Sequence, residues 1–169
     1  MSDDIHAICR RALGFLELGM PEDAIAELDE ITVESSIALH LRVDALFRLE
    51  EWQAAAGVCE PMTRREPSDP GWWIQFAYAV RRARSLEEAE GVLREALGHH
   101  PQHGLILYNL SCYACIRGDR DEAVGLLSRA IAGNPEEMLK MAVRDPDLEG
   151  IRPWILGQPG TPGTSPTVS

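Results

Sequence analysis

Two groups of side chains in the sequence have the types and the spacing for chemistry. Cys112 and Cys115 form a Cys-x-x-Cys pair, and His99, His100 and His103 fall within five residues. Residues three apart on a helix share a face, so both thiols could point the same way and form a redox or metal site. Three neighbouring imidazoles could capture a transition metal such as zinc, nickel or copper.

The surroundings of both groups favour structural roles instead. A reactive or metal-binding thiol pair needs a helix N-terminus or a second pair of ligands, whereas this pair lies in the middle of an expected helix and the sequence has no second Cys-x-x-Cys. Cysteines also serve as small apolar side chains on a helix face, and histidines near a helix end favour its negative pole. The sequence has no glycine-rich phosphate loop, Gly-x-Ser-x-Gly or His-Glu-x-x-His. We therefore expect a chain that is not an enzyme and binds no metal or cofactor. The alternative, a redox or metal protein, would retain metal after dialysis against a chelator.

The composition is that of an ordinary globular protein. Of 169 residues, 45% are hydrophobic and 25% are charged, which suits a single domain with one core. Only three Phe, three Tyr and four Trp occur, and no alternating β-branched run is present. The composition therefore favours an all-helical chain.

The net charge of −11 argues against nonspecific nucleic-acid binding, which needs clustered Lys and Arg. It indicates a solvated acidic surface or a basic partner. Residues 1–34 hold nine acidic side chains against Arg10 and Arg11, a net charge of −7. Any electrostatic preference for a basic partner is therefore expected at the N-terminal end.

The sequence predicts a cytoplasmic protein. It begins with the acidic Met-Ser-Asp-Asp rather than with the basic and then apolar order of a secretory signal. No run approaches the roughly 18 consecutive apolar residues of a membrane-spanning helix. Four cysteines without an export signal are expected to be reduced thiols.

Residues 70–135 contain one pattern twice, and each residue of the second copy lies 34 positions after its counterpart in the first. The matching positions are Trp73, Phe76, Ala77, Val80, Ala89, Leu93, Ala96 and Pro101, and then Leu107, Leu110, Ser111, Ala114, Ala123, Leu127, Ala130 and Pro135. The large residues line one face of a first helix, a small alanine lets the second helix approach it, and a proline ends the pair. A period of this length indicates stacked helical hairpins.

This spacing resembles the tetratricopeptide repeat (TPR), well over residues 70–152 and loosely over residues 4–69. The resemblance implies an all-α, right-handed α-solenoid of about four helical hairpins. They are expected at residues 4–33, 35–66, 70–100 and 104–134, with a cap at 135–156 and a single domain over 1–156. Residues 157–169 are rich in Pro, Gly, Thr and Ser, so a disordered tail is expected there.

Three features of the sequence depart from the repeat. Ala24 and Ala55 are 31 positions apart instead of 34, which indicates an irregular terminal hairpin. Arg42 replaces an apolar residue, a weak spot unless its stem packs and its head reaches solvent. Pro61 falls inside an expected helix, where an interior proline costs about 3 kcal/mol, so we expect a break near Glu60.

The C-terminal part also resembles the closing motif of a group of bacterial TPR proteins. Asn109, Leu110 and Cys112 match its Asn-Leu-x-Cys, and residues 145–148 match its Asp-Pro-Asp-Leu. The implied role is a lid over the last hairpin, in which residues 154–155 hide an otherwise wet face.

By resemblance to the family, fixed positions on the first helix of each hairpin line a groove that binds partners. The residues carried over are Phe47, Arg48, Ile74, Tyr78, Arg81, Arg82, Leu105, Tyr108, Asn109, Cys112 and Ile116, with Ile37, His40, Asp44, Gly71 and Cys115 at further lining positions. An apolar groove with a few arginines suits an extended or helical peptide with an acidic or carboxyl-terminal anchor. The alternative is that the C-terminal cap fills part of this groove. The basic clamp by which some family members hold chaperone C-termini is not reproduced, because Asn109 lacks its Asn and Lys companions.

The sequence thus predicts a non-catalytic protein–protein interaction scaffold that binds a peptide segment of a partner. Two other functions remain open. One is a small acidic chaperone for a secreted protein, which a gene neighbour encoding a secreted protein would favour. The other is a self-associating array that forms a homodimer, which light scattering would detect.

Overall fold

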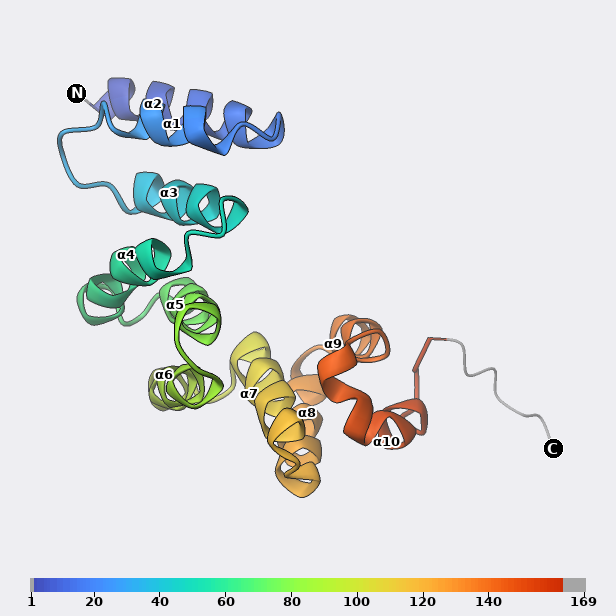
Figure 1. The fold of residues 1–169 in the computed structure, drawn as a ribbon. Helices are drawn as coiled ribbons and strands as arrows, with labels where there is room; N and C mark the ends of the chain where they lie inside the picture. The colour runs from blue at the N-terminus through green and yellow to red at the C-terminus, as the bar shows by residue number, and fades with distance from the viewer. Residues whose placement is uncertain (1, 163–169) are drawn as a thin grey trace. The chain divides into compact units, whose positions relative to one another are not determined.

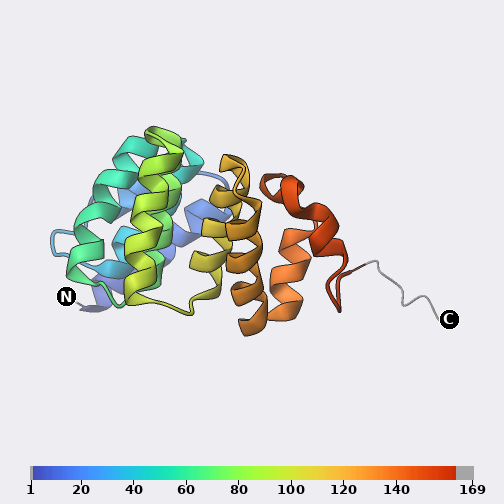
Figure 2. The same cartoon turned by 90° about the horizontal axis from the view of Figure 1, so that it is seen from below.

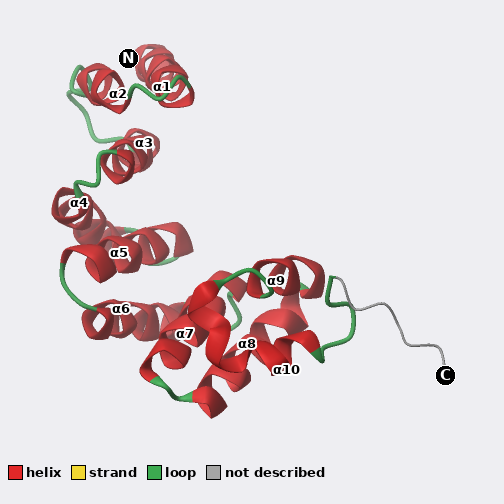
Figure 3. Cartoon of the chain, turned by 45° about the vertical axis from the view of Figure 1, so that its right-hand side comes forward, coloured by secondary structure: helices red, strands yellow, loops and turns green. Residues whose placement is uncertain are grey.

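The computed structural model describes residues 2–162, and every regular element in that range is a helix (Figure 3). The elements labelled in Figure 1 are α1 (Ser2–Glu17), α2 (Pro21–Leu28), α3 (Ser36–Arg48), α4 (Trp52–Arg65), α5 (Pro70–Ala83), α6 (Leu86–His99), α7 (Gly104–Arg117), α8 (Arg120–Gly133), α9 (Pro135–Ala142) and α10 (Arg152–Leu156), with a 3-10 helix, η1 (Pro146–Ile151), before α10. These elements lie within the predicted hairpins and cap, except that α1 begins two residues before the predicted start of the first hairpin. The all-α prediction is confirmed.

The chain divides into two compact units, residues 1–88 and residues 89–169. The division falls in the first turn of α6. The prediction of one domain over residues 1–156 stays a prediction.

The core of unit 1 begins where α1 packs against α2. The apolar stripe of each helix faces the other, so Ala12, Leu16, Ala24 and Leu28 are at most 2% exposed. Pro21 starts α2, where the N–H that proline lacks would have no partner within the helix. Burial of these side chains supplies the main free energy that holds this pair together.

The irregular spacing of the first hairpin comes from α2, which has only eight residues. Residues 29–35 then form a loop, and Ser35 starts α3 by accepting a hydrogen bond from the N–H of Ala38 (3.4 Å). Together α2 and this loop are three residues shorter than α4 with its following linker, 66–69. That difference accounts for the spacing of 31 instead of 34.

The predicted break near Glu60 is wrong, because α4 is one helix from Trp52 to Arg65 with Pro61 inside it. Pro61 and Gly57, the residue four positions earlier whose carbonyl loses its helical partner, are both exposed. Water can therefore solvate that carbonyl, and the cost stays small. On the opposite face, Cys59 and Met62 are at most 2% exposed, and their burial stabilises the continuous helix.

The turn between α3 and α4 contains a strained residue. Glu50 has a φ of +59°, the left-handed region that costs a side chain about 1 kcal/mol or more. Gly118, two repeat lengths later in the chain, holds the same turn position with a φ of +89°. Glycine adopts this conformation without steric cost.

We predict that Glu50→Gly raises the free energy of unfolding by about 0.5–1 kcal/mol, because relief of strain outweighs the added entropy of the unfolded chain. Urea unfolding followed by circular dichroism measures it. Glu51→Gly is the matched control, since Glu51 has a φ of −82° and the same charge change should lower stability there. Equal losses in both variants would contradict the prediction.

Unit 2 is built around α7 and α8, which run side by side in Figure 2 and pack along their length. Small residues lie where they approach, as the repeat predicts: Ala123 is fully buried, and the hydroxyl of Ser111 donates to its carbonyl at 2.7 Å. Asp119 starts α8 by accepting from the N–H of Glu122 (3.1 Å). Close backbone approach and the Asp119 cap stabilise this pair.

The C-terminal segment closes unit 2. Helix α9 packs on α8, and η1 packs on α7 and α8. Leu148, Ile151 and Ile155 are at most 4% exposed, so the segment buries its apolar side chains. The Arg152 guanidinium holds the preceding turn by donating to the carbonyls of Asp145 (2.9 Å) and residue 143.

The disordered tail predicted for residues 157–169 stays a prediction, and the structure describes its first residues, up to 162. Thr161 is 3% exposed, and its hydroxyl lies within hydrogen-bond distance of the carbonyls of Ile155 (2.9 Å) and Gln158 (2.7 Å). The first residues of the tail thus fold back on α10. The rest, residues 163–169, lies outside the described residues.

Candidate functional site

Three aromatic side chains from three helices of unit 1 form a cluster near the surface. Phe47 ends α3, Trp52 begins α4, and Tyr78 lies on α5. The ring centroid of Tyr78 is 5.0 Å from that of Phe47 and 5.9 Å from that of Trp52, and the other two are 5.8 Å apart. The guanidinium carbon of Arg82 lies 3.6 Å from the Tyr78 centroid and 5.1 Å from the Trp52 centroid. The three rings are called the aromatic cage below, and Arg82 lies against two of them.

Arg48 is already engaged within the chain. Its guanidinium donates to both carboxylate oxygens of Asp44 (3.2 Å each) and to the carbonyl of Leu16 (2.7 Å). The last contact ties the end of α3 to the end of α1. Ile74 and Arg81 lie on α5 and are half-buried. Arg48 and Arg82, which the sequence suggests as donors for a carboxylate, therefore both have intramolecular roles.

A groove of about 260 Å³ lies between α1 and α3. Its lining is mostly apolar: His6, Cys9, Arg10, Leu13, Ile37 and Leu41. Leu13 is 44% exposed and Ile37 is 55% exposed, so two large aliphatic side chains lie open to solvent in the same groove. Because α3 also supplies Phe47 and Arg48, the groove and the aromatic cage share one helix.

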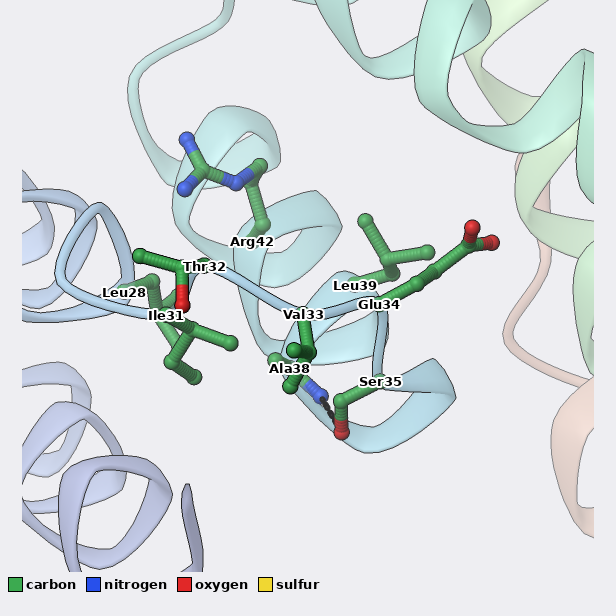
Figure 4. A pocket seen from close by; sticks show the side chains of 9 residues that line it. All are labelled: Leu28, Ile31, Thr32, Val33, Glu34, Ser35, Ala38, Leu39 and Arg42. Atoms are coloured by element: carbon green, nitrogen blue, oxygen red, sulfur yellow. Dashed lines mark hydrogen bonds between the residues drawn. The ribbon is translucent and has the colours of Figure 1, made fainter. Parts of the chain in front are cut away.

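A second cavity, of about 240 Å³, lies between α2, the loop 29–35 and α3 (Figure 4). It is the space that the short α2 leaves open, with Leu28 and Ile31 on one side and Leu39 on the other. The Arg42 head reaches the Asp29 carboxylate at 2.6 Å, and its side chain is only 26% exposed. The aliphatic part of the Arg42 side chain is thus packed and its guanidinium reaches the surface, as expected for an arginine at an apolar position.

His40, which stands alone in the sequence, belongs to a polar network that links α3 to α5. Its ring stacks on Trp72 at 3.6 Å, and its Nδ1 lies 2.8 Å from the Gln75 side-chain oxygen. The Trp72 indole donates to Glu66 (3.1 Å), which also accepts from the Ser36 hydroxyl. These bonds, that of Ser36 first, hold the pKa of Glu66 below its usual range. Trp72 is fully buried. In the sequence, only its position next to Trp73, one of the repeat positions, indicated that it belongs to the core.

In unit 2, the chain itself covers the face of α7 that the family resemblance assigns to partners. The Asp145 carboxylate accepts from the Tyr108 hydroxyl at 2.7 Å and lies 3.6 Å from the Cys112 sulfur. A Cβ on Gly150 would lie 3.0 Å from the Cys115 sulfur, so η1 sits directly on this thiol. Tyr108, Cys112 and Cys115 are 3–8% exposed.

The other α7 residues of the predicted groove remain accessible. Leu105 is 36% exposed and Ile116 is 44% exposed, while Asn109 is half-buried. Leu105 and Ile116 lie at the two ends of the strip formed by Tyr108, Cys112 and Cys115, and Asn109 lies at its edge. The segment 145–151 therefore occupies the middle of the α7 face, which was the alternative left open by the sequence.

Two titratable side chains of unit 2, Tyr108 and His103, have pKa values shifted by burial. Burial raises the pKa of Tyr108, with the Asp145 hydrogen bond adding to the rise, and keeps this phenol a neutral donor. Burial, and then the neighbouring His100, lowers the pKa of His103. Among residues 2–162, no group of three or more His, Cys, Asp and Glu side chains is placed to hold a metal ion.

Four charged residues of unit 2 form a closed network that joins α6, α7 and α8. Glu90 accepts from Arg94 (2.9 Å) and from Arg117 (2.8 Å), and Glu122 accepts from Arg94 (2.7 Å) and from Arg117 (2.5 Å). The Arg94 hydrogen bond is the main reason that the pKa of Glu122 is low.

No helix within the described part of the chain is long and apolar enough to cross a membrane.

No protein-family model matches the sequence, and no curated protein matches it. Solved structures do match. The crystal structure of MamA has a TM-score of 0.68 and 18% identity, covering 79% of this chain and 80% of that one. A thermophilic TPR protein from Thermus thermophilus has a TM-score of 0.66 and 19% identity, covering 79% and 77%. YrrB, described as a TPR protein with an unusual peptide-binding site, has a TM-score of 0.63 and 18% identity, covering 75% and 67%. The chain therefore has the fold of the tetratricopeptide-repeat proteins.

Proposed function

We propose that the chain is a non-catalytic interaction scaffold that binds a peptide segment of a partner protein on unit 1. The site runs over α3, from the groove beside α1 to the aromatic cage beside α5. The observation that carries the proposal is the exposure of large apolar side chains along this path: Leu13, Ile37 and Tyr78 are 40–55% exposed. Such side chains on a rigid surface are typical of sites that bind peptides.

Three further observations support this assignment. The first is that YrrB, which shares the fold, is described as having a peptide-binding site. The second is that Tyr and Trp, which supply two of the three rings of the aromatic cage, are among the residues that dominate binding energy at interfaces. The third is that the segment 145–151 covers the middle of the α7 face, so unit 2 offers less apolar surface to a partner.

The test uses peptides selected by display on the full chain, whose dissociation constants are then measured by fluorescence anisotropy. We expect Ile37→Ser and Tyr78→Ala each to weaken binding at least about tenfold, as truncation of a central interface residue does. Ile116→Ser on α7 is the matched control, because its side chain is 44% exposed like theirs and lies outside the site. Circular dichroism verifies each fold. Undiminished binding by both site variants, or loss in the control alone, would refute the assignment.

A further inference from the structure

We infer that the aromatic cage is a receptor for a cationic side chain of the partner, and that Arg82 occupies it in the unbound chain. The inference rests on the proposed function for its peptide partner, and it names the chemistry of the anchor. It reverses the role that the sequence indicates for Arg82, which would there bind a carboxylate.

The geometry of the cage is that of a cation site. The rings of Phe47, Trp52 and Tyr78 are tilted to one another by 40–68°, so they pack as tilted and edge-on pairs rather than as a flat stack. A cation over an aromatic face within about 6 Å is attracted by the ring quadrupole, and such cages recognise ammonium groups. The guanidinium of Arg82 meets this condition over two of the three rings.

Arg82 is a replaceable occupant. It is exposed, and it lies four residues after Tyr78 on the same helix, so it reaches the cage without help from another element. Among the described residues, no carboxylate lies within ion-pair distance of its guanidinium. A side chain held by ring contacts alone can swing into water when another cation arrives.

Two exposed acidic residues stand in the chain between two rings of the cage. Glu50 and Glu51 form the turn between Phe47 and Trp52, and the Glu50 N–H donates to the Phe47 carbonyl (3.2 Å). Glu50 keeps a charged side chain where the equivalent Gly118 avoids strain. Strain of this kind persists most often at functional positions, and acidic residues on this turn favour a cationic anchor over an acidic one.

The net charge of unit 1 also favours a cationic partner. Residues 1–88 hold 17 acidic side chains against nine basic ones, a net charge of −8. Arg48, the other cation near Phe47, is neutralised by Asp44. A basic peptide therefore approaches with favourable long-range attraction, whereas an acidic one is repelled.

The first experiment probes the cage without a partner. Tetramethylammonium chloride is titrated into the full chain while tryptophan fluorescence is recorded, with sodium chloride at equal ionic strength as the reference. We expect a saturable change in Arg82→Ala, a weaker one in the wild type because Arg82 competes, and none in Arg82→Ala combined with Tyr78→Ala. Trp52→Phe in the Arg82→Ala background assigns the signal, which should vanish there.

The second experiment uses the display-selected peptides. We expect Arg82→Ala to tighten their binding about three- to tenfold, and replacement of a peptide Lys or Arg by Gln to remove that gain. Arg64→Ala is the control, since Arg64 is an exposed arginine on α4 (69%) away from the cage. It should weaken or leave binding unchanged.

The outcomes separate the two proposals. A tetramethylammonium response identical to that of sodium chloride, or weaker peptide binding by Arg82→Ala, would overturn the cationic anchor and leave the peptide site standing. Failure of every selected peptide to depend on Ile37 and Tyr78 would overturn the peptide site, while a saturable response to tetramethylammonium would still establish the cage.

Discussion

Asp145→Ala is expected to make Cys112 and Cys115 at least about fivefold more reactive toward iodoacetamide. The Asp145 carboxylate accepts from the Tyr108 hydroxyl, and its second oxygen accepts from the N–H of Asp147 (2.9 Å), which starts η1. Removal leaves a phenol that is 3% exposed without its acceptor, at a cost of about 1–3 kcal/mol. Since a cost of about 1.4 kcal/mol corresponds to a tenfold change in an equilibrium constant, the opened segment becomes at least several times more populated. The rate of iodoacetamide labelling is proportional to the population of this opened state.

The readout is peptide-resolved mass spectrometry of the labelled full chain. Cys59 provides an internal reference in unit 1, because it is fully buried and burial raises the pKa of its thiol to about 12. Glu136→Ala is the control, an exposed acid on α9 that should leave labelling unchanged. Tyr108→Phe should have a smaller effect than Asp145→Ala, since it removes the donor and leaves the carboxylate bonded to η1. Equal labelling of wild type and Asp145→Ala would show that another contact holds the segment closed.

Glu90→Ala is expected to lower the free energy of unfolding by about 1–3 kcal/mol. The Glu90 side chain is 11% exposed and joins Arg94 to Arg117 across α6 and α7. Breaking a fully buried ion pair costs about 3–5 kcal/mol, but both arginines are more than 40% exposed and can turn to water, so the smaller range applies. Urea unfolding measures the loss. Glu95→Ala on the exposed face of the same helix should cost much less, and equal losses would rule out a role for the network.

Acid should weaken the same network. The pKa of Glu122 is lower in the folded chain than in the unfolded chain, chiefly because of Arg94. Its contribution is therefore fully present above the ordinary pKa of a glutamate, about 4.3, and is lost as the pH falls through the lower folded value. The stability difference between wild type and Glu122→Gln should accordingly shrink toward zero in acid, and a difference that stays constant would contradict this assignment.

Several features of the fold could be predicted because they depend on local pattern. The repeat period reports which side chains are buried at each turn of a helix, and Leu107, Leu110 and Leu127 are at most 1% exposed. Ala123 could be assigned to a helix crossing because only a small side chain permits close approach. The prolines were less certain guides, since Pro61 lies inside a helix whose other face is buried.

The site depended on contacts between residues far apart in the chain. Asp145 and Tyr108 are 37 positions apart, and Glu90 and Arg117 are 27 apart. No periodicity records which polar atoms meet when two helices dock, so the covered face of α7 and the charge network could not be placed from the sequence.

What the sequence determined by itself is the set of helices and the faces they bury, because helix formation and apolar burial follow from residue type and spacing. Tertiary structure alone decided which faces stay open. It put Asp145 and Gly150 over the thiols of α7, and it brought Arg82 onto Tyr78 and Trp52. The physical reason is that exposure of a helix face depends on what the rest of the chain lays against it, and hydrogen bonds and ring contacts act only over a few ångströms.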